Sequence, residues 1–123
     1  GFNVGIEETR FHDHTEWMTP KWETLPMYVF HEDHVTQLPP ECRLLGSTKA
    51  CKIASFAKDD HIFSTQSHPE FSYEFMSCVL RFSESEIPKN VVEGAWSSMK
   101  QDQHGHIFGT WCANFFKKGL RNA

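Results

Sequence analysis

A histidine, a proline and a glutamate stand in a row at residues 68–70, inside the stretch STQSHPEFSYEF. The proline ring disfavours helical geometry at the residue before it, so His68 is expected to be extended and to end the strand HIFSTQS. Glu70 can then point to the same side of the chain as His68. A carboxylate beside an imidazole fixes the ring tautomer and stabilises the protonated ring. The pair therefore has the chemistry of an oriented general base that awaits a nucleophile.

The tripeptide also fits a purely structural role. A strand can turn into a helix at such a corner, and Glu70 would then stabilise the positive N-terminal end of that helix. Three residues are too short a pattern to decide between the two roles. The expected position at the carboxyl end of a strand fits chemistry, because open α/β sheets bind their ligands there, but the spacing alone favours the structural role.

The elements that must position this pair are predicted to be strands first and helices afterwards. Alternating or short apolar runs predict strands, and apolar residues three or four apart predict helices. Strands are expected at 2–11, 27–30, 42–47, 52–57 and 61–68, the last two joined as a hairpin. Helices are expected over 71–82, 88–99 and 107–118.

Two of the expected helices have an evident apolar stripe, which identifies them as helices. The stripe of the last helix consists of Ile107, Trp111 and Phe115. The stripe of the first helix consists of Phe71, Phe75, Val79 and Phe82. Both sets have the spacing of three or four residues that is typical of one helix face.

Size, composition and charge restrict the classes of function. A chain of 123 residues supports one domain, and its 39% apolar and 14% aromatic residues suffice for a core. The net charge of −4 gives no basic face for nucleic acid or an anionic membrane. No apolar stretch approaches the roughly 20 residues of a membrane span. The four cysteines show no C-x-x-C spacing, which favours reduced thiols and a cytoplasmic location.

A longer stretch, HEDHVTQLPPECRLLGSTKACKIASFAKDDHIFSTQSHPEFS, resembles the second half of a class I glutamine amidotransferase domain, the Cys-His-Glu family. In that family a strand ends in H-P-E, and its His and Glu complete a triad whose Cys lies on a nucleophile elbow. GFNVGIEETRF is similar to the G-W-x-V-G strand after the elbow helix. WCANFFKKGLR resembles the C-terminal helix of the eukaryotic branch that contains the plant γ-glutamyl peptidases. The resemblance thus covers nearly the whole chain.

The fold that this resemblance implies is α/β. Residues 1–123 would be the C-terminal portion of a flavodoxin-like three-layer domain, with a small antiparallel hairpin and closing C-terminal helices. The small-molecule substrate would be glutamine or a γ-glutamyl peptide, and no cofactor is implied.

The resemblance also implies roles for single residues. His68 matches the triad base, and Glu70 matches the group that orients it. The segment FHEDHV falls where the family's strand-end loop surrounds the substrate, so His31, Glu32 and Asp33 are implied substrate-binding residues. A local hydrogen bond at the end of the strand would explain His31 and Asp33 equally well.

The family's nucleophile has no counterpart in this sequence. The family places it in a G-x-C-x-G elbow, whereas Cys42, Cys51, Cys78 and Cys112 all lack the flanking glycines. These four thiols are expected to be buried and structural, with Cys51 inside a strand. The glycine-rich oxyanion loop is missing as well. We therefore expect residues 1–123 to be inactive alone and to need a complementary N-terminal segment that carries the nucleophile and covers a bare sheet edge.

Two other classes of function stay open. The chain could be a non-catalytic binding or regulatory module that keeps the fold without the nucleophile. It could also bind a metal, since histidines and carboxylates cluster in HDH, HEDH and HGH, at 12–14, 31–34 and 104–106. Each cluster would need further ligands from elsewhere in the fold, so no metal is expected.

Overall fold

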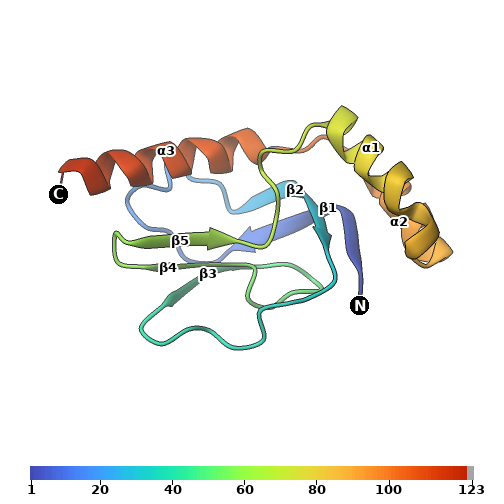
Figure 1. Ribbon diagram of the computed structural model, residues 1–123. Coiled ribbons are helices and arrows are strands. Elements are labelled where there is room, and N and C mark those ends of the chain that lie inside the picture. Colours follow the sequence, from blue (N-terminus) through green and yellow to red (C-terminus); the bar gives the residue numbers. More distant parts are fainter. Residues whose placement is uncertain (122–123) are drawn as a thin grey trace.

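The computed structural model describes residues 1–121, with the strands in the first half of the chain and the helices in the second (Figure 1). All eight expected elements are present. The strands are β1 (Asn3–Phe11), β2 (Thr24–His31), β3 (Arg43–Ser47), β4 (Ser55–Lys58) and β5 (Ile62–Thr65). The helices are α1 (Tyr73–Ser83), α2 (Lys89–Ser98) and α3 (Gly105–Arg121), with a short 3₁₀ turn, Glu84–Glu86, between the first two.

The five strands form one sheet in the order β2-β1-β3-β4-β5, and every neighbouring pair is antiparallel. The expected hairpin of β4 and β5 is confirmed. The sheet curls, because the chain that leaves β5 at one edge reaches β2 at the other. There the backbone N–H of His68 donates to the carbonyl of Tyr28 at 2.8 Å. The elements and their pairing confirm the expected α/β fold with an antiparallel hairpin and closing helices.

Two hydrophobic cores hold the helices to the sheet. The long helix α3 packs over the sheet in the first core, with its expected stripe of Ile107, Trp111 and Phe115 buried. The loop after β1 adds Trp17 and Met18 to that core, although its sequence is mostly polar. The second core lies between β1, β2 and the helices α1 and α2 (Figure 1). Within the described residues, no helix is long and apolar enough to cross a membrane.

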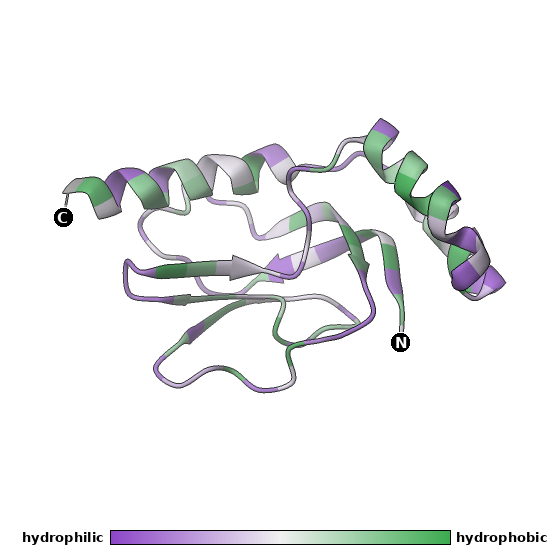
Figure 2. Ribbon diagram, in the orientation of Figure 1, coloured by the Kyte–Doolittle hydropathy of each residue, from purple (hydrophilic) through white to green (hydrophobic). Residues whose placement is uncertain are grey.

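The apolar stripe that identifies α1 in the sequence is not the face that the helix buries. Phe75 is 52% exposed and Phe82 is 91% exposed, whereas Met76 and Leu80 are fully buried. Both pairs have helical spacing, so the helix carries two apolar stripes, and Figure 2 shows both hydrophobic and hydrophilic residues on it. Packing against Ile6 and the residues of α2 selects the second stripe.

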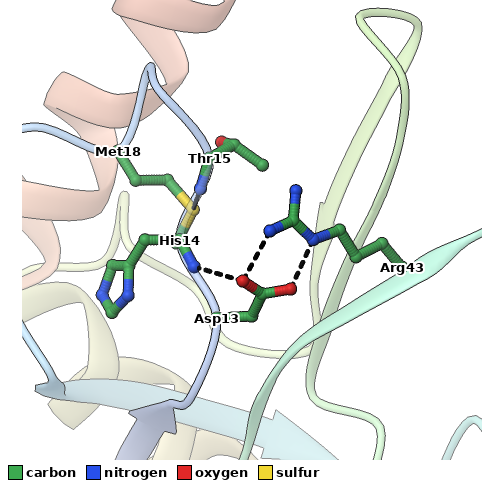
Figure 3. A network of polar contacts seen from close by, with 5 residues as sticks. All are labelled: Asp13, His14, Thr15, Met18 and Arg43. Atoms are coloured by element: carbon green, nitrogen blue, oxygen red, sulfur yellow. Dashed lines mark hydrogen bonds and ion pairs between the residues drawn. The ribbon is translucent and has the colours of Figure 1, made fainter.

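An ion pair ties the loop after β1 to β3 (Figure 3). The guanidinium of Arg43 donates from Nε and Nη2 to the two carboxylate oxygens of Asp13. The backbone N–H of His14 donates to the same carboxylate at 3.0 Å. These contacts, the hydrogen bond from Arg43 above all, hold the pKa of Asp13 below its ordinary value.

We predict that Arg43→Ala lowers the free energy of unfolding by about 1 kcal/mol or less near neutral pH, because both side chains are largely exposed. The pKa of Asp13 is depressed in the folded state. The pair therefore stabilises the fold above the unfolded-state pKa of about 3.9, and this stabilisation disappears as the pH falls through the lower folded-state value.

Urea unfolding at neutral and at strongly acidic pH measures this effect. Arg10→Ala is the control, since the exposed Arg10 has no ion pair within residues 1–121. An equal loss for Arg43→Ala at both pH values would contradict the prediction.

Candidate functional site

The H-P-E corner lies beyond the last strand and not at its end. The sequence predicts that the strand continues to His68, but β5 ends at Thr65. The hydroxyl groups of Thr65 and Ser67 lie 2.6 Å apart, and the Ser67 N–H donates to the Thr65 hydroxyl at 3.1 Å. Such local side-chain bonds compete with the strand ladder and end it. His68 consequently leaves β5 and bonds to β2 through Tyr28.

The corner is a β-turn of residues 68–71. The N–H of Phe71 donates to the carbonyl of His68 at 3.1 Å, which closes the turn. Pro69 occupies its second position, where the fixed φ of proline is favoured. The turn reverses the chain between β5 and α1, so His68 and Glu70 can lie on one side of it.

The side chains of His68 and Glu70 are in contact. Nδ1 of His68 lies 3.1 Å from Oε2 of Glu70. An ionised carboxylate can only accept, so Nδ1 carries the hydrogen and Nε2 of the neutral ring has a free lone pair. Nε2 has no hydrogen-bond partner in the described part of the chain, and the His68 side chain is 35% exposed. This nitrogen can therefore take a proton from a group outside residues 1–121.

Phe71 fixes the plane of the imidazole ring. The rings of His68 and Phe71 stack with centroids 4.2 Å apart and an angle of 9° between their planes. Phe71 in turn contacts the ring of Phe75, at 4.7 Å. Glu70 therefore restrains the rotation of the imidazole while Phe71 restrains its tilt. Sequence reasoning missed this contact, although an aromatic residue at the fourth position of the turn was a visible signal.

His31 ends β2 and lies near His68. Its Nδ1 is 3.1 Å from the backbone carbonyl of Asp33, which is the local strand-end bond considered as an alternative. Burial, followed by the charges of His34 and His68, lowers the pKa of His31, while Glu7 opposes the shift. The ring is thus held neutral near pH 7. The side chains of Glu32 and Asp33 are exposed beside it.

Glu7 and His34 extend this polar region, and sequence reasoning selects neither as a site residue. The His34 ring packs edge-on against His31 with centroids 5.1 Å apart. Its Nδ1 is buried without a hydrogen-bond partner among the described residues, and so is Oε1 of Glu7. The other Glu7 oxygen accepts from the Asn3 amide at 2.9 Å. Strand pairing places Asn3 opposite His31, which no pattern in the sequence reveals.

The four cysteines are free thiols, and within residues 1–121 none of them contacts His68. Cys51 is buried as expected, but it lies in the loop before β4 and not in a strand. Burial raises the pKa values of Cys51 and Cys112, which disfavours the reactive thiolate. Cys78 is exposed on α1, so the expectation that all four are buried is wrong.

The histidine clusters do not assemble a metal site within the part of the chain that the structure describes. No group of three or more His, Cys, Asp or Glu side chains there has an arrangement that could hold an ion.

Comparison with known proteins gives sequence relatives, although no family model matches the chain. γ-Glutamyl peptidase 3 of Arabidopsis thaliana is 33% identical over an alignment of 101 residues, and the match covers 76% of this chain and 39% of that protein. A glutamine-hydrolysing GMP synthase of Cupriavidus taiwanensis is 37% identical over an alignment of 78 residues, and the match covers 56% of this chain and 14% of that protein. The chain thus spans about two fifths of the peptidase.

Two solved structures share the fold. The crystal structure of SMU.1228c superposes with a TM-score of 0.71 at 13% identity, over 94% of this chain and 53% of that one. A GMP synthase protein of Thermoplasma acidophilum gives 0.54 at 18% identity, over 70% of this chain and 48% of that one. With γ-glutamyl peptidases and glutamine-hydrolysing GMP synthases as its sequence relatives, the chain is related to the class I glutamine amidotransferase-like family, as its H-P-E motif predicts.

Proposed function

We propose that residues 1–123 are part of a thiol hydrolase that cleaves the γ-amide of glutamine or a γ-glutamyl peptide bond. His68 is the base of a Cys-His-Glu triad, and Glu70 orients it. The observation that carries this proposal is the contact between Nδ1 of His68 and Glu70, which leaves Nε2 open. The relatives support the class of reaction.

In the proposed reaction, Nε2 of His68 takes the proton from a cysteine thiol as the sulfur attacks the γ-carbonyl carbon. The tetrahedral intermediate collapses when the C–N bond breaks, and His68 gives the proton to the leaving amine or ammonia. Water then attacks the thioester with His68 again as base, which releases glutamate and restores the thiol. Glu70 stabilises the imidazolium that forms in both steps without being consumed.

The substrate-binding role of His31, Glu32 and Asp33 is part of the proposal. His31 supplies a neutral ring near His68, and the neighbouring carboxylates are exposed at the end of the same strand. Carboxylates at this place suit the α-ammonium group that glutamine and γ-glutamyl substrates share.

The nucleophile is proposed to come from a complementary segment that forms the N-terminal part of the domain. Three observations support this. The matched region is 39% of the peptidase, and the chain covers 53% of the neighbour with the higher TM-score. No thiol in the described part of the chain contacts His68. Phe75 and Phe82 expose apolar surface on α1, the helix that begins just after the H-P-E corner. A covering segment would bury this surface.

Mixing the two parts tests this function. We expect residues 1–123 alone to release no measurable product from glutamine or from a γ-glutamyl p-nitroanilide. Adding a segment with a G-x-C-x-G turn should produce turnover, and iodoacetamide should abolish it by alkylating that cysteine. The control is the same segment with its elbow cysteine changed to serine. Robust hydrolysis by residues 1–123 alone would show that the chain is already a complete enzyme.

A non-catalytic binding module is the second candidate, favoured by the lack of a thiol beside His68 among the described residues. The same mixture separates the two. Saturable binding of glutamine by a folded complex, without turnover, would establish the module.

Glu70→Gln should lower kcat of the complemented enzyme by about 10²-fold, because an amide no longer stabilises the imidazolium and can bind the wrong tautomer. KM should stay nearly constant, since Glu70 acts on the chemical step. Steady-state kinetics measures both. The matched control is Glu93→Gln, an exposed glutamate on α2. Unfolding of Glu70→Gln would instead favour the purely structural role of Glu70 at the start of a helix.

A further inference from the structure

We propose that Gly105 is a positioning residue for the His68–Glu70 pair, because it lets the start of α3 press against Pro69 and so fixes the shape of the H-P-E corner. The inference rests on the proposed role of His68 and Glu70. The helix α3 would thus be the third element that positions the corner, besides β5, which precedes it in the chain, and β2, which is hydrogen-bonded to His68.

The approach of α3 to the corner leaves no room for a side chain at position 105. A Cβ added to Gly105 would lie 2.6 Å from the carbonyl oxygen of Pro69 and 2.9 Å from its Cα. Both distances are below 3.0 Å, a separation that real Cβ atoms essentially never show. The two crowded atoms belong to the backbone, so no rotamer change can relieve the contact.

The start of α3 cannot retreat from the corner. The backbone N–H of His104 donates to the carbonyl of Pro26 at 2.7 Å. The N–H of Gly105 donates to Oε1 of Gln103 at 2.8 Å. One turn further on, Phe108 and Trp111 are buried in the first core. These contacts anchor the helix on both sides of Gly105.

The H-P-E corner and the start of α3 are both hydrogen-bonded to the same strand, β2. His68 bonds to the carbonyl of Tyr28, and His104 bonds to that of Pro26, two residues away along β2. Residues two apart on a strand point their carbonyls to the same edge. A rigid strand thus sets the distance between the corner and the helix, and Pro26 is tolerated there because an edge position needs no N–H.

A displaced Pro69 would separate the pair. The pyrrolidine ring locks φ of Pro69 near −65°, so a displacement of Pro69 cannot be accommodated by rotation about its N–Cα bond. The displacement passes to the peptide planes on either side, which carry His68 and Glu70. Their 3.1 Å contact rests on this turn and on the stacked ring of Phe71.

The tautomer of His68 in residues 1–123 is the direct readout. In the wild type, ¹⁵N shifts of the neutral imidazole should show the hydrogen on Nδ1. The ¹⁵N shifts of His68 in Glu70→Ala are the reference for a ring that has lost its contact with Glu70. Gly105→Ala should move the His68 shifts most of the way toward that reference while those of His12, far from the corner in sequence, stay unchanged. Gly109→Ala is the matched control on the same helix, since nothing lies within 4 Å of a Cβ there.

Wild-type His68 shifts in a folded Gly105→Ala would overturn the inference. If that variant does not fold, Gln103→Ala decides, because it removes the acceptor of the Gly105 N–H and frees the first turn of α3. A smaller shift in the same direction supports the inference, and an unchanged spectrum overturns it. The readout needs no turnover, so an active His68→Ala enzyme would refute the proposed function and leave this test standing.

Discussion

His68→Ala is expected to reduce kcat of the complemented enzyme by about 10³-fold, which corresponds to about 4 kcal/mol of transition-state stabilisation. The thiol then has no base to take its proton, and the leaving amine has no acid to protonate it. Substrate binding should change little, because Nε2 acts on the reacting atoms and not on the ground state. Initial rates of glutamine hydrolysis across a substrate range measure both parameters.

The matched control for this substitution is His61→Ala. His61 is an exposed histidine in the turn between β4 and β5. Its variant should keep wild-type kinetics, and both variants should keep the wild-type circular dichroism spectrum. Turnover of His68→Ala within a few-fold of the wild type would refute the assignment of the base.

Trp111→Ala is expected to lower the free energy of unfolding of residues 1–123 by about 3–5 kcal/mol. Trp111 is fully buried, and its ring packs edge-on against Phe11 with centroids 5.0 Å apart. Its Nε1–H donates to the carbonyl of Pro20 at 2.8 Å. The substitution therefore leaves a cavity and also an acceptor without its donor. Denaturant unfolding followed by circular dichroism measures the loss.

Phe116→Ala is the control on the same helix. Phe116 is 67% exposed, so the loss should be below about 1 kcal/mol. Trp111→Phe should fall between the two, because it keeps most of the packing and removes the hydrogen bond. Similar losses for Trp111→Ala and Phe116→Ala would contradict the arrangement of the core.

The sequence by itself predicted the elements and the contact between His68 and Glu70. Strand and helix periods are properties of neighbouring residues, so all eight elements were predictable. Pro69 acts on the residue before it through local sterics, which made the pairing of His68 with Glu70 foreseeable. The longer stretch around H-P-E predicted the family to which the sequence relatives belong, because it fixes many residues in order and not only three.

Only the tertiary structure decided which surfaces these elements bury and what else meets at the corner. Two stripes of α1 have the same period, and only packing against α2 and β1 distinguishes them. The contact of Gly105 with Pro69 joins residues 36 positions apart, and the approach of His31 to His68 joins residues 37 apart. Such contacts depend on the curl of the sheet and on hydrogen bonds to β2, and these arise only when distant segments pack together.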